Sequence, residues 1–207
     1  MTQKDKMYPN LCYHVYHQAV GGENLFRNAN NYAYFLRKYG EHISPIAKTY
    51  AYCLLPNHFH FLVEIRENVY GYYQEKQTLA EKVSLPEADF DVDRFISQQF
   101  QNFLNGYAQA YNKMYNRRGK LFQENVNRKL VNTPDYILQM VHYIHYNPVR
   151  HGFVKKIDDW TYTSLQAFLS EKTTSLERTE LLERFGDKTN FLKYHQNKPV
   201  LGNELLL

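Results

Sequence analysis

A chain of 207 residues, with 43% hydrophobic and 22% charged side chains, is long enough to bury one compact core without disulfides. It contains no apolar run near the roughly 18 residues of a membrane-spanning helix, and no apolar stretch follows its first lysines. We therefore expect a cytoplasmic protein with no membrane partner. Cys12 and Cys53 lie in separate apolar runs and are predicted to be buried thiols.

Aromatic side chains are abundant: 19 tyrosines, 13 phenylalanines and one tryptophan make up 16% of the chain. Aromatic rings can fill a core or stack on unpaired nucleobases, so their number alone selects no functional tyrosine. The formal net charge of +4 permits a polyanionic partner without requiring one. Functional assignments must therefore come from the positions of particular residues.

In chain order, the first expected element is a strand over 11–20, which is rich in β-branched and aromatic residues and stops at two glycines. Helical spacing of aromatic residues then predicts a helix over 28–43. Two more strands are expected over 48–55 and 58–65. The Pro56-Asn57 pair between them indicates an antiparallel hairpin.

Residues 66–90 are polar and show no clear period, which predicts a long irregular insertion. From 91 to 118, apolar residues recur at intervals of three and four, as in a long amphipathic helix. A fourth strand is expected over 120–131.

The last part of the chain is expected to be helical. Thr133 and Pro134 are helix-start signals, and the helix they begin should end at about residue 147, before Pro148. A short helix over about 163–170 and a helical segment over about 175–195 should follow.

This order of elements predicts an α+β fold that resembles the ferredoxin-like split βαβ arrangement. We expect a four- to five-stranded antiparallel sheet with helices on one face. Residues 1–170 should form the main domain, with the insertion at about 66–90, and residues 171–207 a helical C-terminal extension.

Two histidines stand out on the strand over 58–65. His58 and His60 are two residues apart, so both imidazoles project from one face of the sheet, while Phe59 and Phe61 take the opposite face. Two adjacent imidazoles suit one metal ion, but two hydrogen-bonded histidines on a half-exposed face would show the same spacing. Glu64 shares their face, but its distance from His58 along the strand favours a surface position or a supporting role near the site over that of a metal ligand.

The helix over 133–147 carries the second candidate group. Tyr143 and Asn147 are one helical turn apart, on the flank of an apolar stripe that should face the core. An amphipathic helix with an ordinary border tyrosine is the alternative explanation. His142 and His145 point to other sides of this helix, so we expect them to face solvent or phosphate.

Two sequence strings carry a resemblance to a known family. PNHFHFLV at 56–63 resembles the metal-binding motif of the single-tyrosine HUH transposase superfamily, and YIHYNPVRHGFV at 143–154 resembles the tyrosine-bearing helix of its REP-associated branch. Shorter matches run in the family's order from about residue 11 to 168. They are YHV at 13–15, NLFR at 24–27, RGKLFQ at 118–123 and WTYTS at 160–164.

The resemblance implies a DNA strand transferase. Tyr143 would attack a phosphodiester in single-stranded or hairpin DNA, giving a 5′-phosphotyrosine intermediate and a free 3′-OH. His58 and His60 would hold a divalent metal, Mg²⁺ or Mn²⁺, and Asn147 would complete the site. By ligand type alone, two imidazoles suit Zn²⁺ or Mn²⁺ at least as well as Mg²⁺.

Basic residues cluster around these motifs and are predicted to contact the DNA backbone. The candidates are Arg117, Arg118, Lys120, Arg128, Lys129 and Arg150, with Lys155 and Lys156 beyond them. The resemblance further implies a prokaryotic, nucleoid-associated protein, and it leaves open whether a homodimer shares its active sites. The insertion at 66–90 is longer than the family pattern, and His151 stands where alanine is common.

Two other functions fit parts of the sequence. A four-stranded sheet with exposed aromatic residues is also how many non-catalytic single-strand nucleic-acid binders are built. A zinc-dependent hydrolase could use His58 and His60 with a third ligand from elsewhere. A binder needs neither motif and a zinc hydrolase has no use for Tyr143, so the two motifs together favour the strand transferase.

Overall fold

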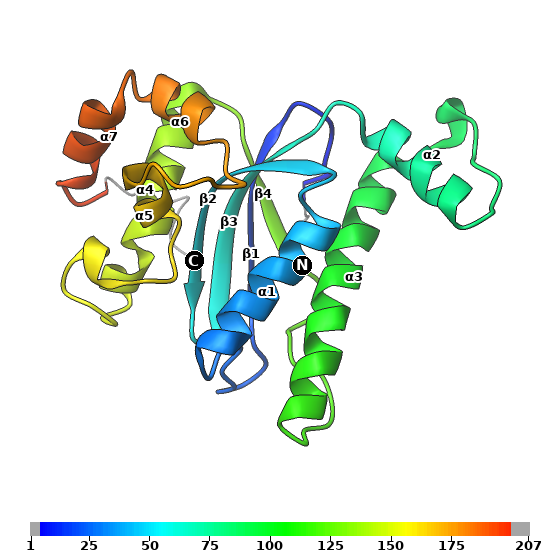
Figure 1. Cartoon of the computed structure of the whole chain (residues 1–207), viewed down its shortest axis with the longest axis horizontal. Coiled ribbons are helices and arrows are strands. Elements are labelled where there is room, and N and C mark those ends of the chain that lie inside the picture. The colour runs from blue at the N-terminus through cyan, green and yellow to red at the C-terminus, as the bar shows by residue number, and fades with distance from the viewer. Residues whose placement is uncertain (1–4, 200–207) are drawn as a thin grey trace.

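The computed structural model describes residues 5–199 and is built around one antiparallel sheet (Figure 1). Its strand order is β2-β3-β1-β4, which confirms the α+β class and the ferredoxin-like topology with four strands. The strands are β1 (Cys12–Gln18), β2 (Ala47–Leu55), β3 (His58–Ile65) and β4 (Asn127–Val131).

Helices cover both faces of the sheet, so the expectation of helices on one face was wrong (Figure 1). On one face lie α1 (Ala29–His42) and α3 (Val92–Met114). On the other lie α4 (Pro134–Arg150), α5 (Leu165–Leu169), α6 (Arg178–Arg184) and α7 (Lys188–His195). The strands carry histidines and a glutamate on this second face, a pattern typical of a solvated surface.

Local sequence signals explain where the helices start. Asn28 caps α1 by accepting a hydrogen bond from the Asn31 N–H, and Thr133 caps α4 by accepting one from the Tyr136 N–H. Pro134 occupies the first turn of α4, where its missing N–H costs nothing. Helices α1, α3 and α4 therefore begin within about two residues of the predicted positions.

Three predictions about where helices and strands lie were wrong. The insertion at 66–90 contains α2 (Val69–Leu79) and a short 3₁₀ turn, Glu87–Asp89. Only Val69 and Tyr73 of α2 are buried, too few to make a visible period. The fourth strand covers only the last part of 120–131, and α4 continues through Pro148 for almost another turn before Gly152, at φ 72°, ends it.

The C-terminal segment packs on the same sheet and its helices are shorter than predicted. Gly186, at φ 88°, separates α6 from α7 where one helical segment was expected. The expected extension runs to residue 207, and its last part, 200–207, lies outside the described residues, as do residues 1–4. In the part of the chain that the structure describes, no helix combines the length and apolarity needed to cross a bilayer.

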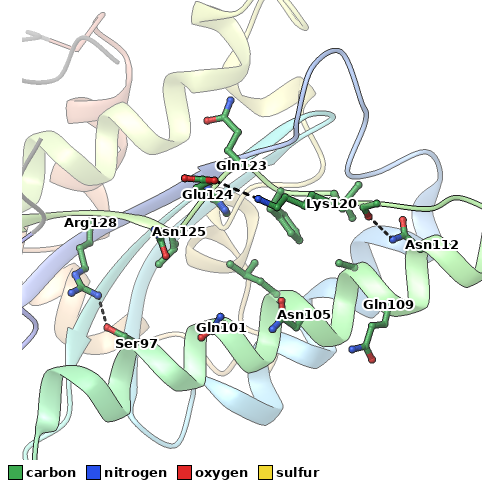
Figure 2. Close-up of a pocket in the computed structure, with 17 residues that line it drawn as sticks. Ser97, Gln101, Asn105, Gln109, Asn112, Lys120, Gln123, Glu124, Asn125 and Arg128 are labelled. Atoms are coloured by element: carbon green, nitrogen blue, oxygen red, sulfur yellow. Dashed lines mark hydrogen bonds and ion pairs between the residues drawn. The ribbon is translucent and has the colours of Figure 1, made fainter. Parts of the chain in front are cut away.

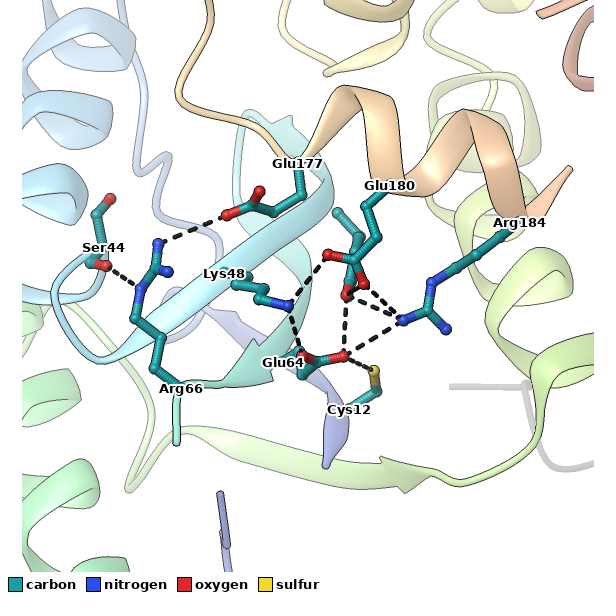
Figure 3. Close-up of polar contacts among 9 residues, drawn as sticks. Cys12, Ser44, Lys48, Glu64, Arg66, Glu177, Glu180 and Arg184 are labelled. Atoms are coloured by element: carbon teal, nitrogen blue, oxygen red, sulfur yellow. Dashed lines mark hydrogen bonds and ion pairs between the residues drawn. The ribbon is translucent and has the colours of Figure 1, made fainter. Parts of the chain in front are cut away.

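An ionic network attaches α6 to the sheet (Figure 3). Lys48 on β2 lies 3.0 Å from Glu64 on β3 and 3.1 Å from Glu180 on α6. Arg184 lies 2.8 Å from Glu180, and the Tyr50 hydroxyl donates to Glu64 at 2.9 Å. Glu64 is therefore a half-buried structural partner of the C-terminal segment.

The outer edge of β2 is covered by the segment that follows α4. The Leu54 N–H donates to the Tyr162 carbonyl at 2.9 Å, and the Ser164 N–H donates to the Tyr52 carbonyl at 3.0 Å. Cys53 and Thr163 form an isolated antiparallel bridge between these bonds. Cys53 and Cys12 are both buried free thiols, as predicted.

Two histidines expected at the surface instead join α4 to α7. His145 is fully buried, and its Nδ1 lies 2.9 Å from His195 Nε2 while its Nε2 lies 2.7 Å from Ser164 Oγ. His142 is 2% exposed, so the expectation was wrong for both residues. The cause is the packing of α7 on α4, which a helical-wheel argument for α4 alone does not include.

The buried histidines predict acid sensitivity. Burial lowers the pKa of His195 to about 4 and that of His145 well below its usual value, so the unfolded chain binds protons below about pH 6.5 while the folded chain does not. The contribution of these buried neutral histidines to the free energy of unfolding is therefore complete above pH 6.5 and falls as the pH drops toward 4. Each such histidine should add about 1.4 kcal/mol per pH unit to the slope of unfolding free energy. Denaturant titrations at pH 7, 6 and 5 give the free energy of unfolding at each pH. This free energy should depend less strongly on pH for His145→Gln than for the wild type, and an equal dependence would contradict this account.

Candidate active site

The tyrosine of α4 and the histidines of β3 meet on the second face of the sheet. The Tyr143 ring centroid lies 5.8 Å from that of His60 and 5.9 Å from that of His14, with the rings nearly perpendicular in both pairs. The two sequence motifs are therefore adjacent within a single chain. Tyr143 is only 1% exposed, so its hydroxyl lies in a largely desolvated environment.

The two β3 histidines are oriented by neighbours through the same ring nitrogen. His60 Nδ1 lies 2.9 Å from His14 Nε2, and His58 Nδ1 lies 2.8 Å from Asn57 Oδ1. Their ring centroids are 5.2 Å apart. In metal sites, one imidazole nitrogen binds the ion while the other donates to such a partner, so both residues have Nε2 left for a metal.

Burial keeps these imidazoles neutral. It lowers the pKa of His58 to about 4, with a smaller contribution from the nearby His151 ring, and it lowers the pKa of His60 well below the usual value. A neutral imidazole has the free lone pair that a metal needs. The His151 ring centroid is 4.7 Å from that of His58, so the residue that departs from the family pattern lies beside the site.

Sequence reasoning gave His14 no role of its own. His14 and Tyr16 are two apart on β1, and Tyr16 is the register partner of His60, so both lie on the candidate-site face. The His14 ring stacks on Tyr16 and His60 at centroid distances of 4.9 and 5.1 Å. The available signal was the spacing of His14 and Tyr16, which repeats that of His58 and His60.

Asn147 and Arg150 surround Tyr143 on α4. The Arg150 guanidinium donates to the Tyr143 hydroxyl oxygen at 3.0 Å and lies 5.4 Å from the centre of its ring. Asn147 is fully buried and its Nδ2 donates to the Tyr143 carbonyl at 3.1 Å. Its Oδ1 is buried with no hydrogen-bond partner among the described residues.

This donor set fits a divalent cation. A buried acceptor without a partner is costly, and a cation would satisfy the Asn147 oxygen. With His58 and His60, it would offer such an ion two nitrogen ligands and one oxygen ligand, and phosphate or water would fill the other positions. Among residues 5–199, no group of three His, Cys, Asp or Glu side chains is placed to hold a metal by itself.

The predicted basic residues fall into separate groups. Lys129 is the register partner of His14, so it lies beside the site together with Arg150. Burial lowers the pKa of His14 to about 3, and the charge of Lys129 adds a smaller contribution in the same direction. Arg117 pairs with Glu23 at 3.1 Å, and Arg128 pairs with Asp93 at 2.9 Å.

The remaining basic candidates lie at the surface. Arg118 and Lys120 are exposed, and Lys120 has a 3.4 Å contact with the equally exposed Glu124. Arg117 and Arg128 thus take part in holding the fold, while the other four candidates are better placed to meet a ligand. DNA contact by any of the six stays a prediction.

Comparison with known proteins places this geometry in context. A Haemophilus influenzae protein curated as "Putative REP-associated tyrosine transposase" is 29% identical over 117 residues, which span 56% of this chain and 58% of that protein. The solved structure of a REP-associated tyrosine transposase bound to a REP hairpin superposes with a TM-score of 0.57. That match covers 83% of this chain and 86% of the other, at 17% identity.

The chain is similar to REP-associated tyrosine transposases in sequence and in fold. The predicted resemblance is thereby confirmed. No family model matches the chain, and the aligned region spans less than two thirds of the curated relative's length. The structural match extends over most of the chain and shows that the fold is shared.

The internal role of Arg128 can be tested by stability measurements. Its side chain is 11% exposed and contacts both Asp93 and, at 2.6 Å, Ser97 Oγ. Removing one partner of such a charged group leaves the other poorly solvated, so Arg128→Ala should lower the free energy of unfolding by about 2–3 kcal/mol. Lys120→Ala is the control and should cost less than about 0.5 kcal/mol because that pair is exposed. Equal effects in urea titrations would contradict the distinction.

Proposed function

We propose that this protein is a DNA strand transferase that uses Tyr143 as its nucleophile. The observation that carries the proposal is the packing of Tyr143 against His60 and His14, with the Arg150 guanidinium on the hydroxyl oxygen. A core tyrosine needs neither a cluster of neutral imidazoles nor a cation at its hydroxyl. Similarity to REP-associated tyrosine transposases supports the same function.

The proposed substrate is single-stranded or hairpin DNA. The solved relative is bound to a REP hairpin, which supports a substrate of this kind. Lys129 and Arg150 would supply positive charge to the phosphodiester at the site. Because Tyr143 is buried and held by Arg150, the phosphate would have to take over this guanidinium contact as it approaches.

The proposed reaction is a transesterification. The Tyr143 oxygen forms a bond to phosphorus, the bond from phosphorus to the 3′ oxygen breaks, and the phenol proton is balanced by the proton that the 3′-OH gains. The 5′-phosphotyrosine bond retains the energy of the phosphodiester, so a 3′-OH can reverse the step at a new junction. Arg150 is placed to keep the hydroxyl oriented before attack.

His58, His60 and Asn147 would hold a divalent metal, Mg²⁺ or Mn²⁺. Such an ion, when bound, polarises the scissile phosphate and stabilises its developing charge. Metal binding at Nε2 of His60 would leave its Nδ1–H to donate to His14 Nε2, so His14 would fix the tautomer and the ring orientation.

Replacing Tyr143 by phenylalanine should abolish covalent attachment to DNA. Tyr143→Phe keeps the ring in the core but removes the attacking oxygen, so cleavage should fall at least about a thousandfold. Binding of the same hairpin should change less than about threefold. Tyr146→Phe, three residues on and partly exposed, is the matched control and should retain activity.

The measurement is incubation of each variant with labelled hairpin DNA and Mn²⁺, followed by denaturing electrophoresis to detect a protein–DNA adduct. An adduct formed by Tyr143→Phe would remove this residue from the mechanism. Hairpin binding by the wild type without any adduct would favour the non-catalytic binder.

Loss of a predicted metal ligand should weaken both metal binding and cleavage. His58→Ala should lower Mn²⁺ affinity about tenfold or more, measured by calorimetry, and should lower cleavage in parallel. His42→Ala, which removes a partly exposed histidine on α1, should change neither. Undiminished cleavage in the presence of EDTA would exclude metal assistance.

A further inference from the structure

An arm made of α2 and residues 80–90 projects from one end of the molecule (Figure 1). A ring contact holds it together, since Tyr73 packs on Phe90 at a centroid distance of 4.8 Å. The Tyr73 hydroxyl accepts a hydrogen bond from the Leu85 N–H at 3.0 Å, and the Tyr70 hydroxyl donates one to the Leu85 carbonyl at 2.9 Å. These contacts fold residues 80–90 back on α2, so the arm is an ordered element.

The arm exposes aliphatic side chains around the end of α2. Leu79 is 78% exposed, Val83 is 94% exposed and Leu85 is 51% exposed. Single exposed apolar residues are common in soluble proteins, but three within seven consecutive residues form a local apolar surface. An ordered element loses little conformational entropy on binding, so this surface is suited to contact another protein.

The charge of the arm is opposite to that of the whole chain. Four carboxylates and two lysines lie between residues 69 and 90, whereas the chain has a net charge of +4. Lys76 is turned toward α3, where it donates to Gln99 Oε1 at 3.0 Å. The carboxylates have no cation within ion-pair distance among the residues that the structure describes; they are Glu75, Glu81, Glu87 and Asp89. The arm would be repelled by a nucleic-acid backbone, and it fits a protein surface that is apolar at its centre and basic at its rim.

A pocket of about 420 Å³ at the other end of the molecule has this complementary character. Its apolar lining includes Val149 on α4, Ile157 on the 3₁₀ turn Ile157–Asp159, and Leu192 on α7. Three lysines also line it, and none of them has an ion-pair partner within residues 5–199: Lys155, Lys156 and Lys198. Asp158 is the acidic residue of the lining, so positive charge prevails.

A second hollow of the surface is less suited to an acidic arm. It is a groove of about 850 Å³ between α3 and residues 119–126 (Figure 2). Its cations already have carboxylate partners, because Lys120 lies 3.4 Å from Glu124 and Arg128 lies 2.9 Å from Asp93. The lysine-rimmed pocket beside α7 is therefore the better receptor for the arm.

The arm and the lysine-rimmed pocket cannot meet within one molecule. The arm extends beyond α3, whereas α4 and α7 lie on the other face of the sheet and at the other end of the molecule (Figure 1). The arm of one molecule can reach the pocket of a second. Such a contact joins two unlike surfaces and leaves one arm and one pocket unoccupied, so it can continue from copy to copy.

We propose that the arm of one molecule binds the lysine-rimmed pocket of a second copy in a head-to-tail assembly. Val83 would enter the apolar centre of the pocket, and the carboxylates of Glu81 and Glu87 would face its lysines. The inference goes beyond the proposed function, since it uses neither Tyr143 nor the candidate metal ligands. Lys155 and Lys156 are also predicted DNA contacts, so the test is made without DNA.

The test uses one variant of each surface. Val83→Arg places a cation on the arm, and Leu192→Arg, at a residue that is 40% exposed, places one in the pocket. Met114→Arg, at an exposed apolar residue at the far end of α3 from the arm, is the matched control. Sedimentation velocity is measured from about 5 to about 300 µM protein in low salt, because one arm tip forms a small interface and the expected Kd is on the order of 100 µM.

The wild type and Met114→Arg should associate as the concentration rises, and association should weaken at least about tenfold in Val83→Arg and in Leu192→Arg. An equimolar mixture of these two variants is decisive. Val83→Arg keeps an intact pocket and Leu192→Arg keeps an intact arm, so the mixture should form a 1:1 complex and nothing larger.

Thermal unfolding checks that the variants are folded, and Lys155→Ala/Lys156→Ala, which changes two exposed residues, is a second pocket variant that should also weaken association. A wild type that stays monomeric at about 300 µM would overturn the inference. So would a mixture that forms no complex, or a control that loses association as Val83→Arg does. None of these outcomes bears on the Tyr143 adduct, which is measured separately.

Discussion

The packing of α4 against the second face of the sheet is the interaction on which the candidate site depends. Val141 and Ile144 of α4 share one apolar core with Leu55 and Leu62 of the sheet, and this contact fixes the rotation of the helix. Tyr143 then meets His60, and Asn147 follows one turn later. Burial of this face also keeps the histidines neutral, so the same packing positions the site and sets its charge state.

Much of the fold follows from local patterns because its elements are marked by local signals. The hairpin at Pro56-Asn57 and the caps at Asn28 and Thr133 each need only a few neighbouring residues. The two motifs likewise predicted which residues share a face of β3 and of α4. Their closeness in space could be expected only from the family resemblance, since no spacing within either motif encodes it.

The failures at buried polar residues have a common physical cause: a residue that looks exposed within its own element is buried when a distant segment supplies its partner. His145 looks like a surface residue of α4, and it is buried because His195 Nε2 and Ser164 Oγ lie within hydrogen-bond distance of its two ring nitrogens. Glu64 is likewise held by distant partners, since Lys48 on β2 and Arg184 on α6 lie within ion-pair distance of it. Arg128 and Lys129 are neighbours in sequence, yet alternation along β4 sends one toward α3 and the other toward His14.

The covering of the β2 edge by residues 162–164 limits how this protein can associate with itself. An exposed edge strand invites a second copy to extend the sheet, but here the backbone groups of Tyr52 and Leu54 are already bonded within the chain. Joining two sheets through β2 would require that segment to detach, at the cost of its hydrogen bonds. A second copy that leaves the segment in place cannot extend the sheet through Tyr52 and Leu54, so assembly through this part of β2 would first have to open the fold of the chain itself.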